Sequence, residues 1–177
     1  AAQYNVHFVY FRKFSNRPSI PQIYIYDYTS QTSPDKDKIA DLHKKLYSAI
    51  QVPMFFVFTS LEVNIFNCFE QPEKDGEIIY KPLETIKIAS DILKTIKKES
   101  QKIKAFSGKL FDNGSFWENS KYSKKFSIKN SAYEKLLKQL RDALNFLTKE
   151  LQISKTITRK LLVMGILIKY LEERKDD

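Results

Sequence analysis

The chain has 177 residues, of which 42% are hydrophobic and 29% charged, with a formal net charge of +9. This composition is typical of a globular protein and excludes a disordered chain. Cys68 is the single cysteine, which excludes an internal disulfide and a thiolate-bound metal cluster, so we expect a cytoplasmic protein. The longest apolar stretch, 161–171, contains Lys169 and is shorter than the ~20 residues that span a bilayer, so no membrane partner is expected.

The positive charge is concentrated in the second half of the chain. Residues 1–84 carry 9 Lys and Arg against 10 Asp and Glu, whereas residues 85–177 carry 21 against 11. A basic region of this kind favours a polyanionic partner such as nucleic acid, or an acidic protein face. A solvated lysine-rich surface that binds nothing explains the same charge, so both interpretations stay open at this point.

The first half has the alternation and the β-branched and aromatic content of a sheet, interrupted by one helical pattern. A Ser-Pro-Asp sequence at 33–35 is typical of a helix start and predicts a helix at 34–49. Along the second strand, Ile23 and Ile25 share a face predicted to be dry, opposite a partly wet face of tyrosines. The expected strands are 6–14, 22–28, 52–59, 62–66 and 78–80.

The second half changes to helical spacing of apolar residues from about Leu83. A break at 108–129, rich in Ser, Asn, Lys and aromatic residues, precedes two further helices, the second near 156–174. That last helix is apolar nearly all round, so we expect other structure to wrap it, supplied by chain beyond Asp177.

These patterns predict an α/β fold, with a mixed sheet and flanking helices, followed by a small helical segment. The expected division is an α/β domain at 1–107 and a basic linker with helices at 108–177. The second part is expected to lead into a downstream domain that the sequence does not include.

The order strand, helix, strand at 20–67 resembles the core of PD-(D/E)xK nucleases. Asp27 stands at the place of a motif acid, but Thr29 occupies the place of the lysine, and no carboxylate precedes Asp27. One acidic ligand is too few to hold a catalytic magnesium ion. The resemblance therefore implies a degenerate restriction-endonuclease-like core, without a metal site and without an assigned catalytic residue.

Two other interpretations of Asp27 stay open. In an active, metal-dependent DNA endonuclease, Asp27 is catalytic and acts with acids such as Asp41 or Glu62. In the other, Asp27 ends its strand and caps the following turn.

Lysines alternate with aromatic residues in the break between the two halves. Lysines in such a loop can contact phosphates, and aromatic side chains can stack on bases. We interpret Phe116 and Trp117 as filling the gap between the sheet and the helices. The candidate DNA contacts are Lys121, Lys124, Lys125 and Lys129.

Four stretches in order along the chain, 8–12, 65–68, 110–118 and 160–174, resemble the N-terminal region of N6-adenine DNA methyltransferases of restriction-modification systems. That family transfers the methyl group with a glycine-containing S-adenosylmethionine motif and an Asn-Pro-Pro-Tyr/Phe motif, and neither occurs here. The resemblance therefore implies a noncatalytic, DNA-binding accessory domain, with S-adenosylmethionine bound elsewhere in the parent protein.

The partners that this resemblance implies are DNA, a downstream methyltransferase domain, and a specificity or restriction subunit. A protein interaction module that docks through the helices at 131–174 is the remaining alternative. Binding through such a surface would be driven by apolar burial and would depend little on salt.

Overall fold

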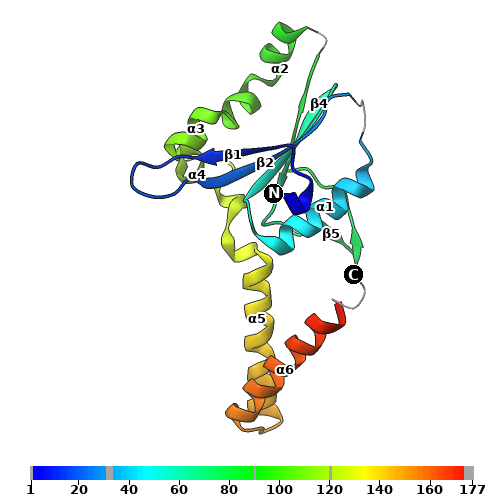
Figure 1. Cartoon of the computed structure of the whole chain (residues 1–177), viewed down its shortest axis with the longest axis vertical. Coiled ribbons are helices and arrows are strands. Elements are labelled where there is room, and N and C mark those ends of the chain that lie inside the picture. Colours follow the sequence, from blue (N-terminus) through cyan, green and yellow to red (C-terminus); the bar gives the residue numbers. More distant parts are fainter. Residues whose placement is uncertain (1, 31–33, 90, 120, 174–177) are drawn as a thin grey trace. The chain divides into compact units, whose positions relative to one another are not determined.

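A computed structural model describes residues 2–30, 34–89, 91–119 and 121–173 (Figure 1). Its contacts divide the chain into two compact units, Ala1–Ala132 and Tyr133–Asp177. The strands are β1 (Phe8–Arg12), β2 (Ile20–Tyr28), β3 (Met54–Thr59), β4 (Glu62–Asn67), β5 (Glu73–Lys74), β6 (Glu77–Ile78) and β7 (Glu84–Lys87). The helices are α1 (Lys36–Ala49), α2 (Ile92–Ala105), α3 (Gly108–Asn113), α4 (Ser115–Asn119), α5 (Ala132–Asn145) and α6 (Lys155–Glu173), with single turns η1 (Ala2–Tyr4), η2 (Ser123–Phe126), η3 (Ile128–Asn130) and η4 (Phe146–Glu150).

The first unit is built on a mixed sheet of five strands in the order β1-β2-β3-β4-β7. Strands β2 and β3 are parallel, with α1 as the crossover between them, and the other neighbours run antiparallel. The sheet and its flanking helices confirm the predicted α/β class, and the expected hairpin is present as β3 and β4. Of the strand expected at 78–80, only Ile78 lies in a strand, β6, which pairs with β5 in a small hairpin.

Both faces of the central strands are buried. The sheet face under α1 contains Tyr24 and Tyr26, which are 4% and 1% exposed, together with Phe55 and Phe66, and Leu46 of α1 belongs to the same buried cluster. The prediction of a partly wet tyrosine face is therefore wrong for Tyr24 and Tyr26, because the apolar stripe of α1 covers their rings. Their hydroxyls stay satisfied, since Tyr26 donates to a backbone carbonyl at 3.1 Å and Tyr24 donates to a side-chain amide oxygen at 2.8 Å.

Helix α1 begins one residue after Asp35. The Asp35 carboxylate accepts hydrogen bonds from the backbone N–H groups of Asp37 and Lys38, at 3.1 and 3.3 Å, and so caps the helix. The Ser33 of the expected Ser-Pro-Asp start lies outside the described residues. The helix ends where Ile50 adopts a left-handed backbone conformation with φ of 51°.

Residues 84–87 form the edge strand β7, although the apolar spacing predicts a helix from Leu83. Ile86 is buried and pairs with Val63 of β4. Over so few residues, apolar spacing does not distinguish a strand from a helix, and pairing with β4 decides the outcome. Helix α2 begins only after Asp91, whose side chain accepts a hydrogen bond from the N–H two residues further on.

The segment 108–126 packs against the opposite face of the sheet. Phe111 and Phe116 are 1% and 0% exposed, and their rings lie 4.5 Å apart within a cluster that includes Ile23 and Phe56 of the sheet. This segment completes the core of the first compact unit, which ends at Ala132. The expected domain boundary between residues 107 and 108 stays a prediction.

The second unit is a pair of helices, α5 and α6, drawn in yellow to red in Figure 1. The π turn η4 ends α5, and Gln152 has a φ of 51° in the connection to α6. Most apolar side chains of α6 are about half exposed, from Ile166 at 45% to Val163 at 65%. The described residues thus do not supply the wrapping expected for this helix. Among them, no helix has the length and apolar character needed to cross a membrane.

The aromatic core predicts that alanine substitutions at two phenylalanines will lower the free energy of unfolding by very different amounts. Replacing Phe66 by Ala should lower the free energy of unfolding by about 3–5 kcal/mol, because its fully buried ring stacks on Phe55 at 4.5 Å. Phe8→Ala is the matched control, since the ring is 59% exposed and should change that free energy by less than about 1 kcal/mol. Urea unfolding followed by the fluorescence of Trp117, the single tryptophan, measures both. Equal losses would contradict the assigned core.

Candidate nucleic-acid interface

The segment 85–132 contains 11 lysines and only 4 acidic residues, and its part from Ala105 to Phe126 packs against one face of the sheet. Ten of these lysines are exposed, and none of the ten forms an ion pair within the described part of the chain. A polyanion can therefore approach these lysines without displacing a carboxylate from any of them. The ten are Lys87, Lys94, Lys97, Lys98, Lys104, Lys109, Lys121, Lys124, Lys125 and Lys129.

The four lysines predicted to contact DNA lie in one short stretch around η2 and η3. All four are exposed, while Tyr122 and Phe126 between them are 2% and 7% exposed. The Nζ atoms of Lys121 and Lys125 lie 5.0 and 6.0 Å from the centre of the Tyr122 ring. The ammonium groups thus project from a backbone that two buried aromatic rings hold in place.

The backbone of this stretch is also hydrogen-bonded to the sheet. Asn67, at the end of β4, is 2% exposed and donates from Nδ2 to the carbonyl of Lys125 at 2.8 Å. The Asn67 side-chain oxygen accepts from the Phe69 N–H at 2.9 Å, which fixes the orientation of the amide. The buried side chain of Asn67 therefore connects the stretch 121–129, called here the lysine-bearing turn, to strand β4.

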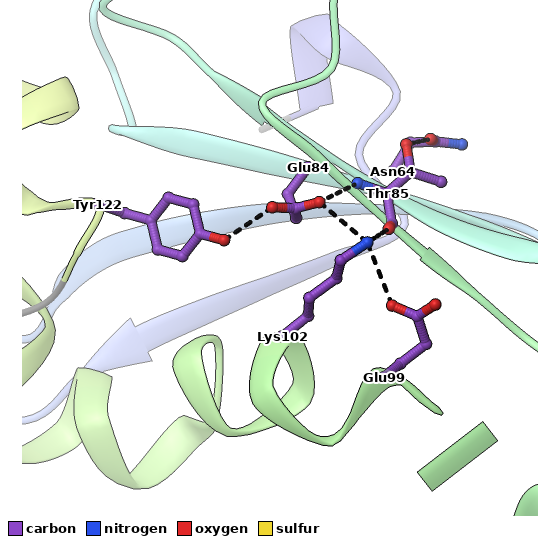
Figure 2. Close-up of polar contacts among 6 residues, drawn as sticks. All are labelled: Asn64, Glu84, Thr85, Glu99, Lys102 and Tyr122. Atoms are coloured by element: carbon purple, nitrogen blue, oxygen red, sulfur yellow. Dashed lines mark hydrogen bonds and ion pairs between the residues drawn. The ribbon is translucent and has the colours of Figure 1, made fainter. Parts of the chain in front are cut away.

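A second anchor is the polar network in Figure 2, centred on Glu84 of β7. The Tyr122 hydroxyl donates to Glu84 Oε2 at 2.7 Å, and Lys102 Nζ of α2 lies 3.1 Å from Glu84 Oε1. Lys102 also donates to the carbonyl of Thr85 at 2.8 Å and lies 3.2 Å from the Glu99 carboxylate. The network joins β7, α2 and the lysine-bearing turn.

The network fixes the charges of its members at neutral pH. Burial raises the pKa of Glu84, but hydrogen bonds from Tyr122 and Lys102 outweigh burial and hold it below the usual 4.5. Burial and the hydrogen bond to Glu84 raise the pKa of Tyr122 to about 12. Burial lowers the pKa of Lys102, but its bonds to Glu84 and Glu99 prevail and raise it. Lys102 therefore stays protonated, and its charge is paired with Glu84 and Glu99 and is not available to a ligand.

Asp27 lies at the end of β2 and is exposed. Its Oδ1 accepts hydrogen bonds from the Thr29 N–H at 3.0 Å and from the Thr29 hydroxyl at 2.7 Å. These hydrogen bonds lower the pKa of Asp27. The interpretation of Asp27 as the cap of the turn after its strand is thus confirmed by this geometry.

The acids considered for a nuclease lie on different faces of the sheet. Asp27 is paired with Phe58, which is paired with Val63, so these three side chains share one face. Glu62 precedes Val63 and points to the other face, and Asp41 is on α1, which covers that other face. Across the described residues, no group of three His, Cys, Asp or Glu side chains is placed to hold a metal ion.

Sequence reasoning missed Glu84, Lys102 and Asn67 as residues that position the lysines. Their partners lie far away in the chain: Glu84 and Tyr122 are 38 positions apart, and Asn67 and Lys125 are 58 positions apart. The assignment of residue 84 to a helix also hid its position on a strand. The sequence does contain one indication: two asparagines, Asn64 and Asn67, interrupt an otherwise apolar strand pattern.

The network predicts how stability depends on pH. Because the folded-state pKa of Glu84 is lowered, its contribution is present above about 4.5 and is lost as the pH falls through the folded-state pKa. Glu84→Gln should therefore unfold more easily than the wild type at pH 7, and the difference should shrink toward pH 3. Urea unfolding at several pH values measures this.

Two variants complete that experiment. Tyr122→Phe removes one hydrogen bond to a carboxylate and should cost about 1.5–3 kcal/mol at pH 7. Glu118→Gln changes the net charge by the same amount at an exposed position of α4 and should unfold like the wild type. If Glu84→Gln and Glu118→Gln behave alike at every pH, the network does not stabilise the fold.

The chain was compared with protein-family models, with curated proteins and with solved structures, and none of the three comparisons gave a match.

Proposed function

We propose that this chain is a noncatalytic DNA-binding accessory domain of a restriction-modification methyltransferase. The observation that carries the proposal is the set of ten exposed lysines on the segment 85–132, which have no carboxylate partners within the described residues. In this proposal the contacts that matter most are Lys121, Lys124, Lys125 and Lys129. The protein acts in the cytoplasm, beside the DNA.

Phosphate contact is the chemistry that this surface suits. Exposed ammonium groups neutralise phosphates and release condensed counterions, which gives affinity that falls steeply with salt and depends little on sequence. The lysine-bearing turn is held by Tyr122, Phe126 and the Asn67 hydrogen bond, so little backbone entropy is lost on binding. A rigid turn with flexible cations fits a role in positioning the duplex.

The restriction-modification context rests on the order of the four stretches at 8–12, 65–68, 110–118 and 160–174. In this context S-adenosylmethionine and the methyl transfer belong to a downstream methyltransferase domain. A specificity or restriction subunit is a further partner in the proposal. The placement of Asp27 in a capped turn, with Glu62 on the other face, supports an accessory role over cleavage.

The proposal predicts that affinity for DNA depends on the charges of the lysine-bearing turn more than on the net charge of the chain. Lys121→Glu, Lys124→Glu and Lys125→Glu together should weaken binding to a short duplex at least tenfold, because three phosphate contacts are lost. The slope of log affinity against log salt should become shallower by about 3, at about 0.9 per contact. Fluorescence anisotropy of a labelled duplex between about 50 and 200 mM salt measures both quantities.

The matched control reverses three exposed lysines elsewhere, Lys44 and Lys45 on α1 and Lys74 on β5. It changes the net charge equally, so it should keep most of the affinity and the wild-type salt slope. If both triple variants lose affinity equally, only the overall charge matters and the assigned interface is wrong. If the wild type does not bind duplex DNA, the proposed function is wrong.

A further inference from the structure

The second unit has an open apolar groove between its two helices. Its volume is about 360 Å³, and its apolar walls come from three leucines of α5 and from three aliphatic residues of α6. Val163 and Ile166 in its wall are 65% and 45% exposed. The apolar lining consists of Leu137, Leu140, Leu144, Leu162, Val163 and Ile166.

Two arginines complete the lining of this groove, Arg141 on α5 and Arg159 on α6. Both are exposed, and neither lies in an ion pair with any carboxylate of the described chain. A guanidinium group forms bidentate hydrogen bonds with a carboxylate, and a pair beside an apolar surface is screened less than one in open water. The groove therefore offers apolar contact and two unused cationic groups together.

The spacing of the wall residues suits a helix as the occupant. Leu137, Leu140 and Leu144 are three and four residues apart, which is the spacing that places side chains along one seam of a helix pair. Helix α6 has 19 residues and is about 28 Å long, enough to guide a partner helix over several turns.

We infer that the α5–α6 groove binds an amphipathic helix of another protein, one with an aliphatic stripe flanked by acidic residues. The aliphatic stripe fills the groove, and the acidic side chains pair with Arg141 and Arg159. This is the helix-in-groove mode of recognition. The acidic flank distinguishes the partner from helices that are merely apolar.

A second copy of the chain fits the groove less well. It would bring its own Arg141 and Arg159 to the same place, so four guanidinium groups would lie close together. Like charges that lose water on association oppose binding. Charge complementarity thus favours a different, acidic partner, independently of the DNA-binding proposal.

The test uses the full chain and two synthetic helical peptides with the same leucine stripe, one flanked by Glu and the other by Lys. The Glu-flanked peptide should bind at least tenfold more tightly in a fluorescence anisotropy assay without DNA. Arg141→Glu with Arg159→Glu should reverse this preference. Both arginines are exposed, so the variant should fold like the wild type.

Two controls separate the groove from the overall charge. Lys138→Glu with Lys149→Glu makes the same charge change outside the groove and should keep the preference for the Glu-flanked peptide. Ile166→Ser should weaken both peptides about tenfold, because it removes an apolar wall.

Several outcomes would overturn the inference. They are equal binding of the two peptides, no binding of either, or an unchanged preference in the double arginine variant. Sedimentation that shows the chain alone forming a dimer, with the peptides unable to compete, would assign the groove to a second copy. Binding to anionic vesicles but to neither peptide would assign it to a lipid surface.

Discussion

The fold depends on the burial of strand β3 on both of its faces. Five of its six residues are buried, with Phe55 and Val57 on one side of the sheet and Met54 and Phe56 on the other. Such a strand is stable only when a layer covers each face. Helix α1 supplies one layer. The other layer is supplied by Phe106 and the segment 108–126, and this requirement brings that lysine-rich stretch onto the sheet.

That requirement links the core to the candidate interface. The second layer covers the sheet with aromatic rings such as Phe116 and Phe126, while the lysines between them stay in water. An aromatic-lysine alternation can thus serve the core and the surface together. Sequence reasoning had assigned Phe116 and Trp117 to packing and the lysines of this segment to phosphate contact. In the structure, Phe116 and Phe126 are buried in the core and the lysines of this segment are exposed.

Local patterns explain most of what the sequence predicted, and long-range pairing explains most of what it missed. The alternation of β2 and the helical stripe of α1 are properties of neighbouring residues, so both elements were predictable. The burial of Tyr24 and Tyr26 depends on where α1 lies, and β7 depends on pairing between Ile86 and Val63. The Glu84–Tyr122 bond joins segments that no local pattern relates.

The nuclease-like order of elements and the chemistry of a nuclease are separable. Parallel strands with a crossover helix follow from backbone connectivity and apolar spacing, whereas a metal site needs carboxylates that converge on one face. Side chains alternate between the two faces along a strand, so Glu62 and its neighbour Val63 lie on different faces of the sheet. Val63 shares its face with Phe58 and Asp27, and Glu62 therefore lies on the face away from Asp27. The hydrogen bonds from Thr29 then occupy Oδ1 of the Asp27 carboxylate in a turn. A chain can thus have the strand, helix, strand order at 20–67 while the carboxylates that a metal site would need lie on different faces of the sheet.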